Sequence, residues 1–279
     1  MDLDQLKGIV STVLSKRASS GTPLHIPEGG AFGHASGDAA EEWCLDGLSK
    51  ALTNVDVKWV HSFLTEALGV RVLRLSGPQS PTAIKTTIDR ETWWSPLLLN
   101  RKAVEGYLEK GECQKWQQAG ADLTMTQGTY PFTGVNDLVL LNVKSHALGR
   151  ASRPPNIMSG LRLLEFFDRI LADKNSNALL SATNLWLVGI GYQEVSPVKV
   201  EEVKVLDLFR IDVSAISQIN FDAAIQLQFR VSEMEEKRQS KLDFISALSE
   251  RFLNDWRRHA TQKEAKFTQL VGRVQRNLR

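Results

Sequence analysis

The chain has 279 residues, and 34 Lys and Arg against 32 Asp and Glu give a formal net charge of +2. A chain of this length can bury one substantial core, and its two cysteines, Cys44 and Cys113, belong to no metal-spaced set. The small net charge means that any DNA contact has to come from locally basic surface. The sequence has no signal peptide pattern and no apolar run of membrane length, so we expect a soluble cytoplasmic protein without a membrane partner.

The first third of the chain is expected to be mainly helical. The Gly-rich loop within it lacks the Lys-Ser/Thr ending of a phosphate-binding loop, and this excludes nucleotide binding there. The expected elements are helices over 4–16, 38–51 and 58–68, a loop over 18–32, a short strand over 71–75 and a helix that starts near Pro81.

Two strands are predicted at 121–126 and 138–144, and they carry the most informative side chains of the chain. Asp122 lies on the first, and Asn142 and Lys144 share one face of the second because side chains alternate along a strand. A strand-borne carboxylate holds Mg²⁺ through oxygen, and a facing lysine steers water or stabilises the charge that builds on phosphorus. The pattern indicates metal-dependent cleavage of a phosphodiester, with a solvated surface pair as the alternative.

Asp137 competes with Asp122 for the metal-binding role because it also precedes the lysine closely. At ~3.3 Å per residue the stretch from Asp137 to Lys144 is long, and the odd spacing turns the two side chains to opposite faces. We therefore prefer Asp122, from the neighbouring strand.

The second half of the chain alternates helix and strand patterns. Asn156 is placed as the N-cap of the first of these helices. From Lys241 onward nine Lys and Arg face four Asp and Glu, so this helical segment has a basic outer face. The expected elements are a helix over 156–172, a buried strand over 185–191, an edge strand over 199–207, strands over 216–219 and 225–231, and one or two amphipathic helices over 241–279.

Several stretches of the chain follow one another in an order that is informative when taken together: Gly33 to Asp38, Ala121 to Leu123, Leu140 to Ser145, Ser152 to Ser159, and Ala223 to Val231. In these stretches the sequence resembles the HincII-type type II restriction endonucleases, which belong to a nuclease superfamily with an acid-then-acid-x-Lys active site.

The resemblance implies one restriction-endonuclease-like α/β domain over 1–279, with a mixed β-sheet core flanked by helices and a long C-terminal helical segment. It implies a homodimer that cuts double-stranded DNA at a short palindromic site, leaving 5′-phosphates and blunt ends. Asp122, Asn142 and the backbone carbonyl of Val143 would hold Mg²⁺, with Mn²⁺ as a substitute, and Lys144 would complete the catalytic set with Asp122 and Asn142.

The sequence departs from the family at Asn142, where the pattern has aspartate. An amide keeps a carbonyl oxygen but loses the negative charge, so the metal would be held more weakly. Glu41, expected in the first turn of its helix, is a candidate accessory acid, and Glu165 is a second. The alternative function is a sequence-specific DNA-binding protein with weakened or lost cleavage, and a DNA-repair or nicking nuclease is a third.

A loop that enters the DNA groove is also implied, between the catalytic strand and the following helix. Two prolines stiffen it, so its polar side chains are presented with little entropy left to lose. The predicted DNA-binding residues are Arg150, Ser152, Arg153, Asn156, Gln226 and Gln228.

Overall fold

The structure is a computed structural model that describes residues 1–26, 32–60, 62–63, 66, 120–127, 138–149, 154–222 and 225–277. For residues 32–35 it describes the backbone only. The strand predicted at 71–75 and the helix predicted near Pro81 lie outside these residues.

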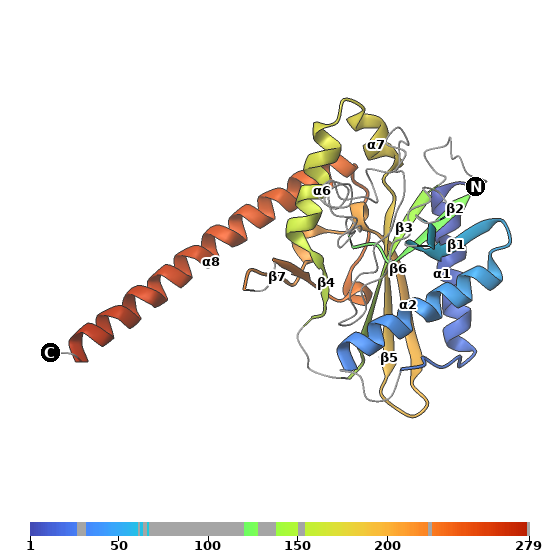
Figure 1. The fold of residues 1–279 in the computed structure, drawn as a ribbon, viewed down its shortest axis with the longest axis horizontal. Coiled ribbons are helices and arrows are strands. Elements are labelled where there is room, and N and C mark those ends of the chain that lie inside the picture. Colours follow the sequence, from blue (N-terminus) through green and yellow to red (C-terminus); the bar gives the residue numbers. More distant parts are fainter. Residues whose placement is uncertain are drawn as a thin grey trace.

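A five-stranded mixed sheet forms the centre of the fold, in the order β1-β2-β3-β5-β6 (Figure 1). The pairs β1–β2, β2–β3 and β5–β6 are antiparallel, and β3–β5 is parallel. The strands are β1 Val55–Trp59, β2 Leu123–Gln127, β3 Leu138–Ala147, β5 Leu185–Gln193 and β6 Lys199–Asp207. The expected α/β class and the edge position of the 199–207 strand are thus confirmed.

The strand β3 separates two apolar cores. Its odd-numbered residues Val139, Leu141 and Val143 pack into one cluster, and its even-numbered residues Leu138 and Leu140 pack into the other. Burial on both faces is typical of a strand in the middle of a sheet that is covered by helices on both sides. The even-numbered face is the one that continues to Asn142 and Lys144.

Two helices cover the odd-numbered side of the sheet. In α1, Leu3–Ser19, the residues Leu6, Val10 and Leu14 recur every four positions and are fully buried. The second helix is α2, Phe32–Ala51, which also contacts β3. Burial of such a stripe accounts for most of the stability of a surface helix.

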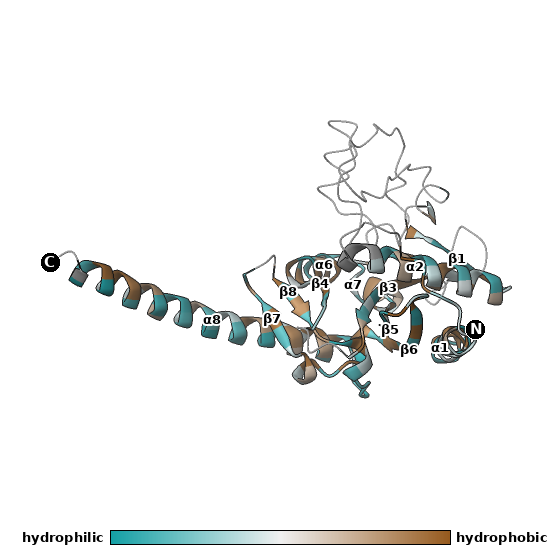
Figure 2. Ribbon diagram, turned by 90° about the horizontal axis from the view of Figure 1, so that it is seen from below, coloured by the Kyte–Doolittle hydropathy of each residue, from teal (hydrophilic) through white to brown (hydrophobic). Residues whose placement is uncertain are grey.

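The even-numbered side is covered by helices and a small second sheet of order β4-β8-β7. Its elements are β4 Asn156–Ser159, α6 Gly160–Ala172, α7 Ser176–Ala182, β7 Gln218–Asn220, β8 Gln226–Gln228, and three short 3₁₀ turns at Leu208–Arg210, Val213–Ala215 and Val231–Glu233. The last helix, α8 Lys241–Asn277, packs its first turns on this core and then projects from the body (Figures 1 and 2).

Three predicted boundaries were wrong in other segments, and the strand predicted over 225–231 is shorter than expected, at Gln226–Gln228, because Val231 begins a 3₁₀ turn. Lys58 and Trp59 belong to β1, because they pair with Thr124 and Leu123, and helical backbone begins only at Val60. The helix α2 begins at Phe32, so Glu41 lies well inside it and not in its first turn.

The third wrong boundary is at Asn156, which is a strand residue paired with Gln228 and not a helix N-cap. The N-cap of α6 is Ser159, whose hydroxyl accepts a hydrogen bond from the backbone N–H of Arg162. Strand pairing with a distant segment outweighed the local helical spacing here.

Among the described residues, no helix combines the length and the apolar character that crossing a membrane requires.

Candidate active site

Asp122 is held by backbone hydrogen bonds immediately before β2. Its N–H donates to the carbonyl of Leu141 at 2.7 Å, and its own carbonyl accepts from the N–H of Val60 at 3.2 Å. The residue is thereby fixed between β1 and β3, at the end where β2 begins. A side chain on such a rigid support has little freedom left to lose when it binds a ligand.

The carboxylate of Asp122 meets Lys144 and the backbone of β3. Its Oδ2 accepts from the N–H of Val143 at 2.8 Å and from Nζ of Lys144 at 3.2 Å. Nζ of Lys144 also donates to the carbonyl of Val143 at 2.8 Å. The side chains are 13% and 24% exposed, so the pair is largely buried yet open to solvent, unlike the surface pair that was the alternative.

Asn142 lies beside this pair with one half of its amide satisfied. Nδ2 donates to the carbonyl of Gly120, while Oδ1 is buried and has no hydrogen-bond partner within the described part of the chain. The reverse amide orientation would set Oδ1 against the Gly120 carbonyl, so the orientation follows from the network. Leaving a buried acceptor without a partner costs about 1–3 kcal/mol of folding free energy, so a ligand that bonds to Oδ1 would recover this energy.

Gly120 was not singled out from the sequence, although it orients Asn142. Its φ of +71° suits glycine, and a Cβ there would lie 3.1 Å from Nδ2 of Asn142 and 3.8 Å from Cβ of Met158 on β4. The only sequence signal was a glycine two residues before Asp122. Gly120 thus lies two residues before Asp122, accepts a hydrogen bond from Asn142 and approaches Met158 of the second sheet.

The oxygen atoms of the site fit a hard cation such as Mg²⁺. Oδ1 of Asp122 makes no hydrogen bond to any described residue, and Oδ1 of Asn142 is likewise unpaired. The carbonyl of Val143 is a third oxygen, at present bonded to Lys144. No group of three or more His, Cys, Asp or Glu is placed for a metal within the described ranges, so the set depends on amide and backbone oxygens.

Glu41 lies on the inward face of α2 and is 6% exposed. Burial first, and then the negative charges of Glu41 and Asp122, raise the pKa of the Cys44 thiol. The two acids therefore act on one buried group, the Cys44 thiol of α2. Glu165, the other candidate acid, is exposed on α6.

His146 continues the row formed by Asn142 and Lys144, two residues further along β3. Burial lowers the pKa of its imidazole, and Glu202, Arg230 and Glu233 also act on it. We did not select His146 from the sequence, although the alternation that grouped Asn142 with Lys144 would have included it.

The predicted DNA-binding residues are only partly described. Arg150, Ser152 and Arg153 lie outside the described residues. Nε2 of Gln228 donates to Oδ1 of Asn156 at 2.8 Å, and this bond joins β8 to β4. Gln228 is buried and Gln226 half-buried, so of the three described residues only Asn156 is exposed.

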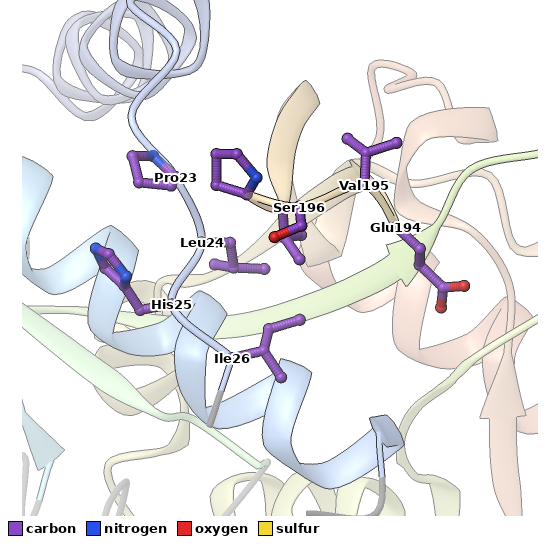
Figure 3. A pocket seen from close by; sticks show the side chains of 9 residues that line it. Pro23, Leu24, His25, Ile26, Glu194, Val195 and Ser196 are labelled. Carbon is purple, nitrogen blue, oxygen red and sulfur yellow. The ribbon is translucent and has the colours of Figure 1, made fainter. Parts of the chain in front are cut away.

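A shallow hollow of about 360 Å³ lies elsewhere, between residues 23–26 and the turn 194–198 (Figure 3). Leu24 and Ile26 point toward its centre in Figure 3, whereas the Glu194 carboxylate points away. None of Asp122, Asn142 and Lys144 lines it.

No protein-family profile matches this chain, and no curated protein matches it.

Proposed function

We propose that this protein is a Mg²⁺-dependent endonuclease that hydrolyses phosphodiester bonds of double-stranded DNA at a short palindromic site, as type II restriction endonucleases do. One observation carries the proposal. The Asp122 carboxylate meets the Lys144 ammonium at 3.2 Å, and Asn142, two residues before Lys144 on the same face of β3, has an amide oxygen without a partner among the described residues. Carboxylate, lysine and further oxygen ligands in a partly buried site are the groups that metal-assisted phosphodiester hydrolysis uses.

Each residue has a distinct role in this proposal. Asp122, Asn142 and the Val143 carbonyl would hold Mg²⁺ or Mn²⁺, and the bound ion would lower the pKa of a water and polarise the phosphoryl oxygens. The N–H of Val143 holds the carboxylate in place through Oδ2. Lys144 would exchange its contact with the Val143 carbonyl for the attacking water or the phosphoryl oxygens. The products would be a 5′-phosphate and a 3′-hydroxyl.

A palindromic site has two-fold symmetry, and a homodimer with one active site for each strand matches that symmetry. Asn156 is exposed at the edge of the small sheet, and its Oδ1 would have to exchange the bond from Gln228 to make a paired contact to adenine. Blunt ends would result if the two sites act on directly opposite phosphates.

The test is digestion of a fully sequenced phage genome and a supercoiled plasmid with Mg²⁺. We expect discrete fragments, and we expect Lys144→Met to lower the cleavage rate about 10²- to 10³-fold while DNA binding is retained, because charge stabilisation is lost. Lys204→Met is the matched control, since Lys204 lies on β6 and its Nζ bonds to Glu235 and to the carbonyl of Ser232. Unchanged cleavage by Lys144→Met would refute the proposed site.

A second candidate is a DNA-binding protein that does not cut. The neutral amide at Asn142, already tied to Gly120, favours it because a ligand without charge holds Mg²⁺ weakly. Selective binding of one sequence in a gel-shift assay, with no cleavage in Mg²⁺ or Mn²⁺, would support this alternative. Nicked plasmid would instead indicate single-strand cutting.

A further inference from the structure

The helix α8 carries one apolar seam along its whole length. At 1.5 Å per residue its 37 residues span about 55 Å, and only the first part is covered by the body. The buried residues of the seam recur at helical spacing and belong to the core: Phe244, Ile245, Leu248 and Phe252.

Residues 221 and 222 of the body contact the next three turns of α8, up to Lys263. Phe221 contacts the ring of Trp256 at 5.5 Å and the ring of His259 at 5.4 Å between centroids. One turn further on, Nζ of Lys263 forms an ion pair with Oδ1 of Asp222 at 2.7 Å. Beyond Lys263, no hydrogen bond, ion pair or ring contact joins α8 to any other described residue.

The apolar seam continues along α8 beyond Lys263, where its contacts with the described part of the body end. Phe267, Leu270, Val271 and Val274 follow at the same spacing and are 68%, 49%, 37% and 51% exposed. We call residues 264–277 the arm. In Figures 1 and 2 the arm projects freely from the body, and Figure 2 shows apolar residues along it. Four large apolar side chains in one row on a projecting helix are typical of an interface.

Charge decides which kind of partner fits this row. The arm carries three Lys and Arg against one Glu, a net charge of +2, whereas residues 1–263 carry 30 Lys and Arg against 31 Asp and Glu, a net charge of −1. Two arms would repel each other, while an arm and the body of another copy attract. Phosphates alone would leave the apolar row uncovered.

We propose that the arm packs on the body of a second copy of this chain, so that two copies exchange arms about a two-fold axis. A strip about 20 Å long and 10–12 Å wide, the diameter of a helix with its side chains, is buried on each arm, together with an equal area beneath it. Two such contacts bury on the order of 1,000 Å², which is the lower limit for a specific interface.

Sedimentation velocity on the full-length protein, without DNA or Mg²⁺, tests this proposal independently of nuclease activity. We expect a dimer for the unaltered chain and at least a tenfold weaker dimer, by about 1.4 kcal/mol, for Phe267→Glu with Val271→Glu. The matched control is Ala265→Glu with Gln269→Glu, which adds the same charges at the same spacing on the opposite face. A monomeric unaltered chain, or equal loss of the dimer in both variants, overturns the proposal.

Cross-linking decides whether the arm meets a body or another arm. A mixture of ¹⁵N-labelled and unlabelled chains is treated with a lysine-reactive cross-linker. We expect links between copies from Lys266 to lysines that precede residue 241. Links between copies that join only Lys263 or Lys266 to one another would contradict arm exchange. Circular dichroism shows whether each variant keeps its helix content.

Discussion

At the scale of the residue, Asn142 has two duties that conflict. Its Nδ2 donates to the Gly120 carbonyl, and its buried Oδ1, which has no partner among the described residues, would bind the proposed cation. An aspartate would improve the second duty and lose the first, because a carboxylate cannot donate to the Gly120 carbonyl. The amide therefore stabilises the turn that precedes Asp122 at the expense of negative charge at the proposed metal site.

This conflict predicts opposite effects of Asn142→Asp with and without Mg²⁺. In EDTA we expect the variant to be less stable by about 1–3 kcal/mol, because a hydrogen bond is lost and two oxygens face each other. Mg²⁺ should stabilise the variant more than the unaltered chain, since binding to the native state raises stability. Thermal unfolding with EDTA and with Mg²⁺ measures both effects. Equal melting temperatures in EDTA would contradict the role assigned to the Gly120 contact.

If the proposed function holds, Asn142→Asp should also cleave DNA faster at saturating Mg²⁺. An unchanged rate would favour another carboxylate, such as Glu41, as the compensating group.

Lys241 is a second residue whose environment has a measurable consequence. Its Nζ donates to the carbonyls of Leu180, Ser181 and Thr183 at 2.9, 3.0 and 2.7 Å, and so ties the start of α8 to the end of α7. Burial lowers the pKa of this ammonium to about 8, from 10.5 for an ordinary lysine. Cations suit the carboxyl end of a helix, but here the charge is also poorly solvated.

The lowered pKa predicts the sign of a pH effect. Between pH 8 and 10.5 the unfolded chain binds more protons at this lysine than the folded chain, so its contribution to the free energy of unfolding rises with pH. Urea unfolding of the unaltered chain and of Lys241→Met at several pH values measures it. We expect the difference in stability between the two to shift toward the unaltered chain above pH 8. A constant difference across this range would refute the assignment.

At the scale of the element, glycines in β5 allow the close packing beside the site. Gly189 pairs with Lys144, and a Cβ on Gly189 would lie 2.5 Å from Cβ of Val231 in the 3₁₀ turn that follows β8. The turn can approach β5 this closely only because the side chain is missing. The residue paired with Lys144 thus packs directly against the side chain of Val231.

Gly189→Ala is accordingly expected to destabilise the protein by about 1–3 kcal/mol, because the added methyl group overlaps Val231. Gly8→Ala in α1 is the matched control, since nothing lies within 4 Å of a Cβ there. We expect that control to be neutral or to stabilise by up to about 1 kcal/mol, as alanine is the better helix former. Urea denaturation gives both values, and equal effects at the two glycines would contradict the packing argument.

At the scale of the whole molecule, contacts between distant segments close the fold around the sheet. Nζ of Lys7 bonds to Oε1 of Glu236 at 2.7 Å, and Arg210 pairs with Asp4 at 2.7 Å. The same Glu236 carboxylate accepts from the N–H of Asp207 at the end of β6. The N-terminal helix is thus joined to the segment that leads into α8.

The sequence alone determined the elements whose residues bury their own periodic faces. The strands β3, β5 and β6 and the long helix α8 follow from alternating, continuous or helical apolar spacing, which needs no knowledge of the partner. The same alternation put Asn142 and Lys144 on one face and allowed Asp122 to be chosen as their neighbour.

Only the tertiary structure decided the features that depend on distant backbone groups. Lys58 and Trp59 became a strand because β2 offered hydrogen bonds, and Asn156 became a strand because Gln228 lay opposite. The hydrogen bond from Asn142 to the Gly120 carbonyl joins residues 22 positions apart in the sequence. It leaves Oδ1 of Asn142 without a partner among the described residues. A local pattern can record which side chain is apolar, but it cannot record which carbonyl a donor will meet after folding.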